Sequence, residues 1–434
     1  MKNQNRQPEK NYQGITLKTK YESCFMPILL DDYTFCSYNC LYCDANARKS
    51  INLRAKKQGN IVKHDSMPLR TIDPDLIKRV FTAILNGGEI PKTYRFLEKY
   101  VKNRKMIQFG TVSDPFCNNE RKYGVTYELL EFFDEIDYPL TFCSKGSMYT
   151  KPKYMNIIKN HSHNWHFRIA ISTSNDLIAR KVERGVPSPT ERFNNIKKLS
   201  KNGIKVTHII RPLIPGYSDV KGLVTKAKMS GAYACKIRDL LVKPVLPEFY
   251  KNRMLKLSEI TGVDLYDLYT KKSQEERDKI LQPYYDEFIE TCRKLKLYYA
   301  CNKSRQIYTP SYCCCAIPPD MHKYLYFGNF THAVEQAQRR KSDIITFKDV
   351  GKYSKECFKG VESEVSACIA DSRSKAQTLN MDCHDFTRWC WNNPRKVELR
   401  TRNHVEKVGI DENGDNLYRV KELEGWYEKD KQTD

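Results

Sequence analysis

Short apolar runs alternate with stretches of helical periodicity from about residue 26 to residue 242. The runs predict strands at 26–35, 106–110, 138–143, 166–173, 204–214 and 235–242, and the periodic stretches predict helices at 74–87, 125–136, 151–160, 189–203 and 219–231. Strands and helices that alternate with short connections predict parallel pairing through right-handed crossovers. We therefore predict an α/β fold with a parallel (β/α) barrel, and we prefer a partial barrel to a full one. A doubly wound open sheet is the alternative.

The alternation of predicted strands and helices is confined to the middle of the chain and divides the sequence into three parts. Residues 1–22 form a polar, basic lead-in, and residues 23–300 form the predicted barrel, with a polar insertion around 250–282 and a further helix at 283–300. Residues 301–434 are rich in Cys and aromatic residues and predict an α+β extension that contains a hairpin turning at Asn413–Gly414. Residues 411–434 carry eight acidic and four basic side chains, which predicts a solvated acidic tail.

Charge and cysteine content narrow the function. Lys and Arg number 74 against 52 Asp and Glu, which leaves a net charge of +22, and Tyr numbers 28. Cations suit phosphates and aromatic rings suit bases, so the composition predicts nucleic acid as a partner. The N-terminus lacks the apolar core of a secretory signal, and no apolar run reaches the length of a membrane span. We therefore expect a cytoplasmic protein without a membrane partner, whose 16 cysteines serve as metal ligands more than as disulfides.

Three cysteines follow the first predicted strand with the spacing C-x3-C-x2-C: Cys36, Cys40 and Cys43. Three thiolates from one loop can hold three irons of a [4Fe–4S] cluster and leave the fourth iron open to a substrate or cosubstrate. A structural zinc site takes four protein ligands, so the alternative is a zinc loop completed by a distant residue such as Cys24.

This loop resembles the cluster motif of the radical S-adenosylmethionine (SAM) enzymes, in which an aromatic residue such as Tyr42 precedes the third cysteine. The segments 109–116, 182–206 and 211–219 resemble the spore photoproduct lyase-like branch, and the resemblance covers about residues 23–245. It implies that an external electron donor and the cluster cleave SAM to a 5′-deoxyadenosyl radical, which abstracts hydrogen from the substrate.

The resemblance also implies roles for residues at the strand ends. Lys145 is expected to meet the SAM carboxylate, and Ser113 with Asp114 to lie near the SAM amino group. Ser172 and Ser174 are expected to bond the ribose or carboxylate, and Glu183 to line the pocket. The alternatives are a solvated side chain for Lys145, a turn at Asp114–Pro115 and a helix cap for the two serines. For Glu183 and Arg184 the alternative is an ion pair that fixes the loop. Arg192 is expected to have a structural role.

The chain departs from the spore photoproduct lyases at their hydrogen-donating cysteine. Those enzymes carry it beside the serine after the second strand, where this chain has Val112. The nearest thiol is Cys117, which we consider a candidate hydrogen donor, with a small buried residue as the alternative. The departure puts thymine-dimer cleavage in doubt and leaves radical formation unaffected.

The C-terminal cysteines suggest an auxiliary site. Cys301, Cys313 and Cys315 are candidate ligands of a second Fe–S cluster or of zinc, and free thiols in a small core are the alternative. Basic residues at 48–57 and 339–341 are candidates for contact with nucleic acid, with a solvated surface as the alternative. Aromatic residues at 322–327 are candidates to stack on bases, with a place in a core as the preferred alternative.

The sequence thus leaves three functions open. The preferred one is a radical SAM enzyme that repairs or modifies nucleic acid. The second is a radical SAM enzyme that modifies a peptide or protein with an auxiliary cluster. The third is a metal-stabilised nucleic-acid-binding protein without catalysis.

Overall fold

The fold is seen in a computed structural model. It describes residues 7–17, 26, 28–43, 45, 69–242, 248–301, 315–325, 333, 340, 342–350, 383–393 and 405–420.

The central element is an eight-stranded, mostly parallel sheet. Its strands follow the order β1 (Ile15–Leu17), β2 (Ile28–Leu30), β4 (Ile107–Phe109), β5 (Leu140–Ser144), β6 (Trp165–Ala170), β8 (Val206–Leu213), β9 (Ala234–Asp239) and β10 (Tyr298–Cys301). Pairing is parallel from β5 to β6, from β6 to β8 and from β8 to β9. The predicted α/β class is confirmed. Among the described strands β1 and β10 end the order, so the sheet is open, as a partial barrel is.

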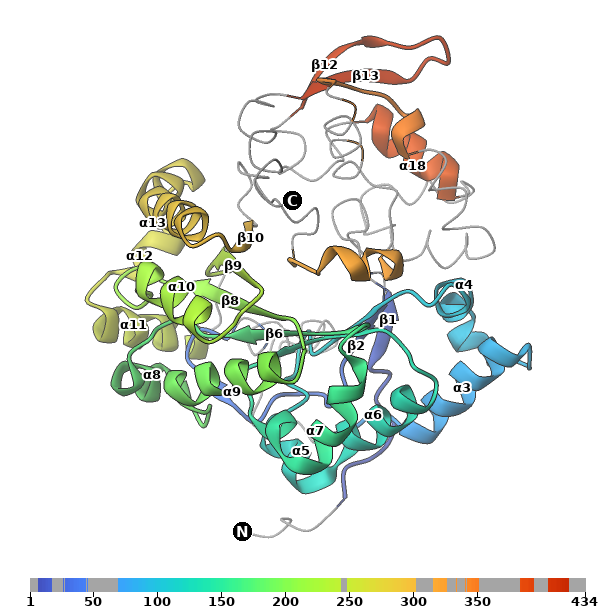
Figure 1. Cartoon of the computed structure of the whole chain (residues 1–434). Helices are drawn as coiled ribbons and strands as arrows, with labels where there is room; N and C mark the ends of the chain where they lie inside the picture. The colour runs from blue at the N-terminus through green and yellow to red at the C-terminus, as the bar shows by residue number, and fades with distance from the viewer. Residues whose placement is uncertain are drawn as a thin grey trace. The chain divides into compact units, whose positions relative to one another are not determined.

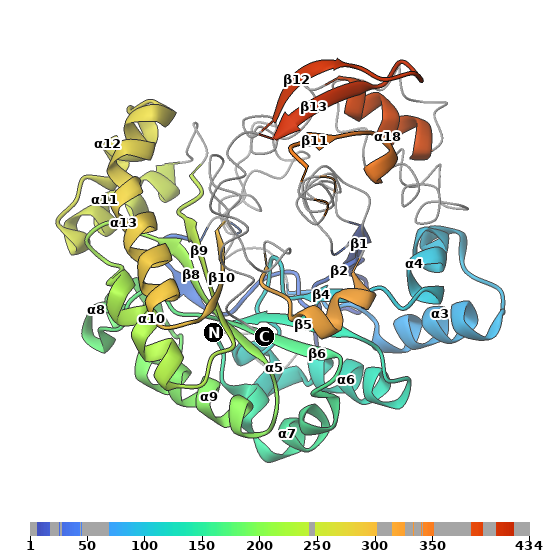
Figure 2. The ribbon, with the colours of Figure 1, turned by 45° about the horizontal axis from the view of Figure 1, so that its top comes forward.

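Helices follow most of the strands, as the alternation predicts. Their bounds are α3 Pro74–Asn86, α4 Glu98–Lys102, α5 Asn118–Tyr123, α6 Val125–Glu135, α7 Pro152–Ile158, α8 Asp176–Val182, α9 Pro189–Lys201, α10 Val220–Met229, α11 Glu248–Thr261, α12 Leu265–Thr270, α13 Gln274–Lys294 and α18 Cys383–Asn392. Short 3-10 helices cover Lys92–Leu97, Met148–Thr150, Lys159–His161 and Pro319–Tyr324. Figures 1 and 2 show α6, α7, α9 and α10 along one side of strands β5 to β8, so these helices cover one face of that part of the sheet.

The strands of the sheet centre are buried on both faces, although one face of β6 carries His166 and Arg168. All six residues of β6 are buried, and an aromatic cluster fills the adjoining core. In it the rings of Phe142 and Phe167 stack with centroids 4.5 Å apart, and Phe116 packs edge-on to Tyr149 at 5.2 Å. Continuous burial of this kind is typical of a parallel sheet covered by helices.

Local signals set the helix ends. Ser188 caps α9 by accepting a hydrogen bond from the Glu191 amide, Pro189 occupies the first turn, and Gly203 follows with a φ of +79°. Ser273 and Glu276 form a capping box at the start of α13.

One predicted segment, at 283–300, differs from the structure. The polar stretch around 250–282 is helical, in α11, α12 and the first turns of α13, and its assignment as an insertion stays a prediction. The helix predicted at 283–300 begins earlier and ends at Lys294, and residues Tyr298–Cys301 form strand β10. Lys296 has a φ of +50°, and this left-handed residue breaks the helix before the β-prone Tyr298 and Tyr299.

The chain divides into two compact units. One consists of Met1–Gly14, Leu30–Pro74 and Phe109–Tyr299, and the other of Ile15–Leu29, Asp75–Gln108 and Ala300–Asp434. In the second unit β11 (Ile344–Ile345), β13 (Asn416–Val420) and β12 (Val405–Ile410) form an antiparallel sheet. The predicted hairpin is therefore confirmed, with Gly414 at a φ of +78° in its turn. The predicted three-part domain division and the α+β extension stay predictions.

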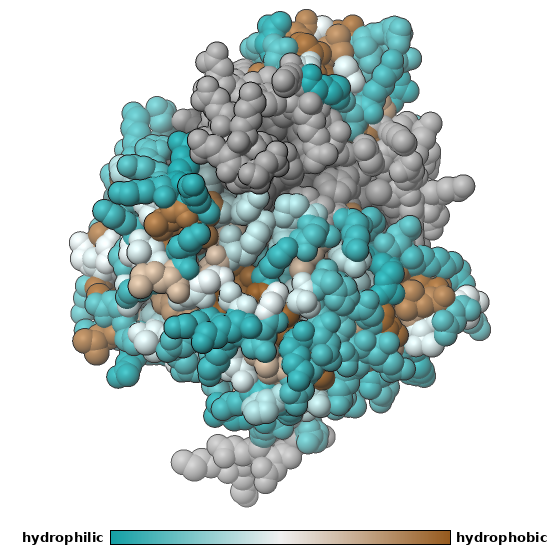
Figure 3. Space-filling view, in the orientation of Figure 1, coloured by the Kyte–Doolittle hydropathy of each residue, from teal (hydrophilic) through white to brown (hydrophobic). Residues whose placement is uncertain are grey.

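The surface agrees with the high charged content of the chain. On the face in Figure 3 hydrophilic side chains cover most of the described surface. Among the described residues no helix is long and apolar enough to cross a membrane.

Candidate active site

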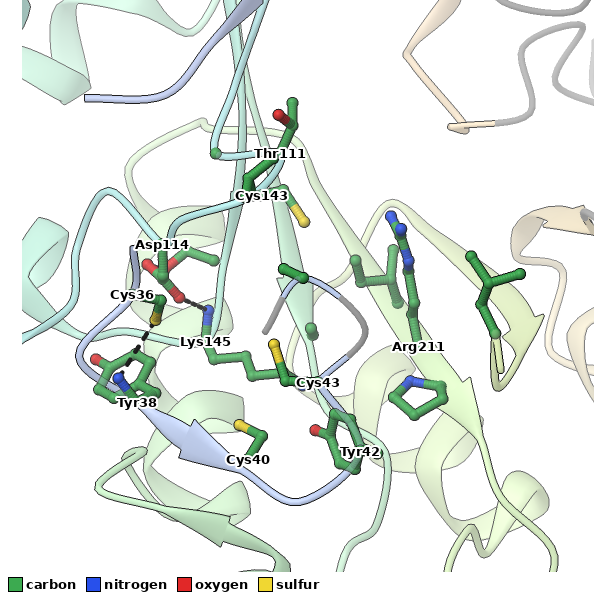
Figure 4. A pocket seen from close by; sticks show the side chains of 18 of the residues that line it. Cys36, Tyr38, Cys40, Tyr42, Cys43, Thr111, Asp114, Cys143, Lys145 and Arg211 are labelled. Carbon is green, nitrogen blue, oxygen red and sulfur yellow. Dashed lines mark hydrogen bonds between the residues drawn. The ribbon is translucent and has the colours of Figure 1, made fainter. Parts of the chain in front are cut away.

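A cavity lies where the parallel strands β4, β5, β6, β8 and β9 end, inside the first compact unit (Figure 4). A loop of residues 36–43, here called the cysteine loop, forms one wall. The lining residues are Cys36, Tyr38, Cys40, Tyr42, Cys43 and Ala45, then Gly110–Asp114, Cys143–Lys145, Ala170, Ile209, Arg211, Pro212 and Arg238–Leu241. The structure thus brings the three predicted cluster cysteines together with Tyr42, Ser113, Asp114 and Lys145. Cys117, Ser172, Ser174 and Glu183 are not among the lining residues.

Backbone pairing anchors the cysteine loop. Strand β3 (Asn39–Cys40) pairs antiparallel with β7 (Glu183–Arg184), so that Cys40 lies opposite Glu183. The Leu41 amide donates to the Val182 carbonyl at 2.9 Å, and the Tyr250 hydroxyl donates to the Tyr42 carbonyl at 3.1 Å. These contacts hold the loop by its main chain and leave its cysteine side chains directed to the cavity.

The three thiols suit a metal centre. Among the described residues none of them forms a disulfide; Cys40 is buried, while Cys36 and Cys43 are partly exposed. Burial raises the pKa of the Cys40 thiol, so a thiolate at this position needs a cation to stabilise it. The Tyr38 amide donates to Cys36 Sγ at 3.4 Å, a contact of the kind that tunes cluster sulfur.

Glu183 lies behind the cysteine loop in a buried charge network. Its carboxylate accepts hydrogen bonds from the Tyr42 hydroxyl, from Arg192 and, at 3.0 Å, from Lys145 Nζ. Burial raises the pKa of Glu183, but the charges of Arg192 and Lys145 outweigh this effect and lower it to about 2. Glu183 is therefore ionised, and the ion pair that the sequence offered as an alternative is present, with Arg192 and Lys145 as the partners.

Buried carboxylates shape the loop that follows β4. Asp31 accepts hydrogen bonds from the amides of Thr111, Val112 and Ser113 at 2.8 to 3.0 Å. Gly110 begins this loop with a φ of +84°, and a Cβ there would lie 2.7 Å from the Cys143 carbonyl oxygen. Glycine is required at this close approach of two strand ends.

Asp114 closes the same loop. Its carboxylate accepts from the Ser144 hydroxyl at 2.8 Å, the Lys145 amide at 2.6 Å and the Phe116 amide at 3.0 Å. The last bond is the turn that the sequence gave as the alternative reading for Asp114. Its predicted contact with a cofactor stays a prediction, as does that of Ser113.

The two serines after β6 have different surroundings. The hydroxyl of Ser174 donates to Asp219 Oδ2 at 2.5 Å, and Asn175 caps α8. The hydroxyl of Ser172 is buried and has no hydrogen-bond partner in the part of the chain that the structure describes. An unsatisfied buried hydroxyl costs free energy, so Ser172 is suited to bond a ligand at this strand end.

Cys117 is fully buried at the N-terminal end of α5. A hydrogen bond between its thiol and that of Cys36 lowers the pKa of Cys117 and raises the pKa of Cys36. A hydrogen donor must reach the substrate radical, so Cys117 can act in that role only through movement toward the cavity. The role stays a prediction, and the observed contact also positions Cys36.

Sequence reasoning missed Arg211, which Figure 4 shows at the cavity. It lies near the end of β8, is partly buried, and has no hydrogen-bond or ion-pair partner among the described residues. The only sequence signal is an arginine before Pro212 at the end of an apolar run. With Lys145 and Arg238 it brings positive charge to a cavity that Asp114 and Asp239 also line.

The candidate auxiliary site is largely beyond the described residues. Cys313 and the side chain of Cys301 lie outside them, as do Cys24 and the basic stretches at 48–57 and 339–341 apart from Arg340. Cys315 is described and is buried in an apolar cluster with Met26, Met106 and Ile317.

Three comparisons place these features among known proteins. The family model of the radical SAM superfamily matches residues 31–222. An uncharacterised protein of Methanocaldococcus jannaschii is 24% identical over 200 residues, which are 46% of this chain and 65% of that protein. The chain therefore spans slightly less than two thirds of this curated relative.

Solved structures with a similar fold were also found. SuiB of Streptococcus suis bound to the precursor peptide SuiA is 11% identical, with a TM-score of 0.39 over 66% of this chain and 50% of that chain. A mutant of spore photoproduct lyase is 14% identical, with a TM-score of 0.42 over 67% of this chain and 79% of that chain.

Proposed function

We propose that the chain is a radical SAM enzyme that acts on nucleic acid, since the family model of the radical SAM superfamily matches residues 31–222. Cys36, Cys40 and Cys43 would hold a [4Fe–4S] cluster, with SAM at its open iron. The observation that carries the proposal is that these three thiols of one loop line one cavity at the carboxyl ends of parallel strands. A cluster and SAM bound there supply a 5′-deoxyadenosyl radical when an external donor provides an electron.

The residues around the cavity would orient the cofactor. Arg211 offers a guanidinium without a partner among the described residues. Ser172 does not line the cavity but lies two residues after Ala170, which does, and it offers a buried hydroxyl without a hydrogen-bond partner among the described residues. Lys145 also faces the cavity, but its ammonium already contacts Glu183. We therefore assign the carboxylate of SAM to Arg211 and Lys145 together, and a cofactor hydroxyl or carboxylate to Ser172.

Other residues would keep the cysteine loop in place. Glu183 ties Tyr42 to Arg192 and Lys145, and the β3–β7 pair fixes Cys40. Loss of this support would displace the cluster ligands. The reaction would then be slower, because a small misplacement of reacting groups costs much of the rate.

The choice of nucleic acid as substrate depends on charge. The chain carries a net charge of +22, and Lys145, Arg211 and Arg238 all line the cavity. Cations at a cavity mouth attract a phosphodiester chain and raise its local concentration. Cys117 remains our candidate hydrogen donor, and the C-terminal cysteines our candidate for an auxiliary cluster or zinc.

The test is the release of 5′-deoxyadenosine by anaerobically reconstituted, reduced protein. The reaction is run alone and with single-stranded DNA, duplex DNA, RNA or a basic-residue-free peptide library. The matched control is the Cys36→Ala/Cys40→Ala/Cys43→Ala protein, which retains the remaining cysteines.

We expect release by the wild type, none by the triple variant, and stimulation by a nucleic acid. Release that only peptides stimulate would keep the radical chemistry and overturn the nucleic-acid substrate. A wild-type protein that holds zinc in place of iron after reconstitution and releases no 5′-deoxyadenosine would overturn the enzyme, and would favour the metal-stabilised binding protein.

A further inference from the structure

A second group of metal-ligating side chains lies at the opposite ends of the strands from the cavity. Asp137 lies in the turn between α6 and β5, and His161 and His163 lie just before β6. One ligand atom of each lies within 4.8 Å of the others. The other end of β6, at Ala170, lines the cavity, and five residue steps of about 3.3 Å separate the two ends. The group is therefore separate from the cysteine loop.

The distances within this group match those between ligands of one small metal ion. His161 Nδ1 lies 3.2 Å from Asp137 Oδ1, and His163 Nε2 lies 3.0 Å from the same oxygen. Zinc bonds to nitrogen and oxygen of about 2.0 to 2.2 Å place tetrahedral ligands about 3.3 Å apart. Two imidazoles and one carboxylate are also a donor set that zinc favours.

The residues around the group orient the first imidazole. His161 is buried, its ring stacks on Trp165 with centroids 4.1 Å apart, and its Nε2 lies 2.6 Å from Asp134 Oδ1. If Nε2 donates to Asp134, the ring presents Nδ1 as a lone pair toward Asp137. Without the ion, Nδ1 lies 3.2 Å from Asn164 Oδ1, and the Asn164 amide donates to Asp137 Oδ1 at 2.7 Å, so zinc would replace these contacts. In zinc sites a carboxylate commonly accepts the N–H of a ligating histidine, which fixes the orientation of the ring and leaves its other nitrogen to bind the metal.

The backbone holds the two segments together before any ion binds. The Leu140 amide donates to the Asn164 carbonyl at 3.1 Å, and the Asn164 side chain donates to the Asp137 carbonyl at 3.0 Å. The Trp165 indole donates to the Tyr138 carbonyl at 2.8 Å. The ligands therefore sit on a framework in which little conformational entropy remains to be lost on binding.

We propose that Asp137, His161 and His163 bind one zinc ion, with Asp134 as the hydrogen-bond partner of His161 and water completing the coordination. The site joins the α6–β5 turn to the start of β6 and takes no part in the radical chemistry. It is independent of the proposed function, because it shares no residue with the cavity. The competing account is a metal-free network in which protonated histidines pair with the two aspartates.

The experiment measures the zinc content of the full-length protein, purified without air and dialysed, by mass spectrometry of the metal. The variant is His163→Ala, because the His163 side chain is 53% exposed and its loss leaves the core intact. The matched control is Asn160→Ala, an exposed residue of the short helix that ends at His161. Zinc held by cysteines elsewhere contributes equally to all three proteins, so the difference between them isolates this site.

We expect wild type and Asn160→Ala to hold about one equivalent of zinc more than His163→Ala. Asp134→Asn should keep the site but weaken zinc binding by about 10- to 100-fold, the usual effect of removing the partner of a ligating histidine. Cobalt(II) in place of zinc should give a wild-type minus His163→Ala spectrum without a thiolate charge-transfer band. Equal zinc contents in folded wild type and His163→Ala, or a thiolate band in that difference spectrum, would overturn the site and leave the ion-pair network.

Discussion

Replacing Glu183 by glutamine removes a buried carboxylate that three side chains share and keeps its volume. The Glu183 and Arg192 side chains are 1% and 0% exposed, and Lys145 is 15% exposed. The variant leaves the guanidinium and the ammonium buried without their counter-charge. Removing one partner of a buried ion pair costs about 3–5 kcal/mol, since the remaining charge stays desolvated.

The pKa of Glu183 supports the same magnitude. The folded protein lowers it from 4.5 to about 2 because Arg192 and Lys145 outweigh the effect of burial. At 1.36 kcal/mol for each pKa unit, the ionised form stabilises the fold by about 3 kcal/mol. A lowered pKa contributes stability that is present above about pH 4.5 and is lost as the pH falls toward 2. The difference between wild type and variant should therefore shrink over that range.

The assay is urea unfolding of the cluster-free proteins at pH 7 and at pH 4, followed by circular dichroism. Glu183→Gln should lower the free energy of unfolding by about 3 kcal/mol at pH 7, and the reconstituted variant should hold less iron. Glu191→Gln, at an exposed position on α9, is the control and should stay within about 0.5 kcal/mol of wild type. A loss below about 1 kcal/mol for Glu183→Gln, or one equal to the control, would refute the reasoning.

Two further predictions concern the cavity itself. Arg211→Gln should weaken SAM binding about 10- to 100-fold, which is the contribution of a charge-assisted hydrogen bond, and should leave the iron content unchanged. Arg211→Lys should recover part of the affinity. Equilibrium dialysis with labelled SAM measures the affinity, and an unaltered value in Arg211→Gln would remove Arg211 from the site. Cys117→Ser should leave 5′-deoxyadenosine release within about twofold of wild type but stop conversion of the substrate radical to its normal product; mass spectrometry of the nucleic acid measures this, and an unchanged product would exclude the thiol as hydrogen donor.

The parts of the fold that could be predicted are those that depend on local pattern. Buried parallel strands such as β6 and β8 are rich in apolar residues, although each also contains a histidine and an arginine, and α9 has both a capping serine and a terminating glycine. Strand β10 was predicted as the end of a helix because the aromatic pair Tyr298–Tyr299 follows helical periodicity without a proline or glycine between them. Its backbone reversal depends on Lys296, a residue with no sequence signal for positive φ.

The candidate site shows the same division. The C-x3-C-x2-C spacing is a local signal, and the structure does bring its three side chains to one cavity. The partners of Glu183 could not be predicted, because Tyr42, Lys145 and Arg192 are far apart in the sequence and meet only through the tertiary fold. Arg211 was missed for a related reason. Only the structure shows that this arginine has no partner among the described residues and faces the cavity.

The most direct test of the account is electron paramagnetic resonance of the reconstituted, dithionite-reduced protein with and without SAM. An open iron that binds SAM should give a [4Fe–4S] signal whose g-values shift on SAM addition, and the Cys36→Ala/Cys40→Ala/Cys43→Ala protein should lack the signal. A SAM-sensitive cluster signal that persists in the triple variant, or a wild-type spectrum that SAM leaves unchanged, would contradict the assignment of Cys36, Cys40 and Cys43 to a SAM-binding cluster.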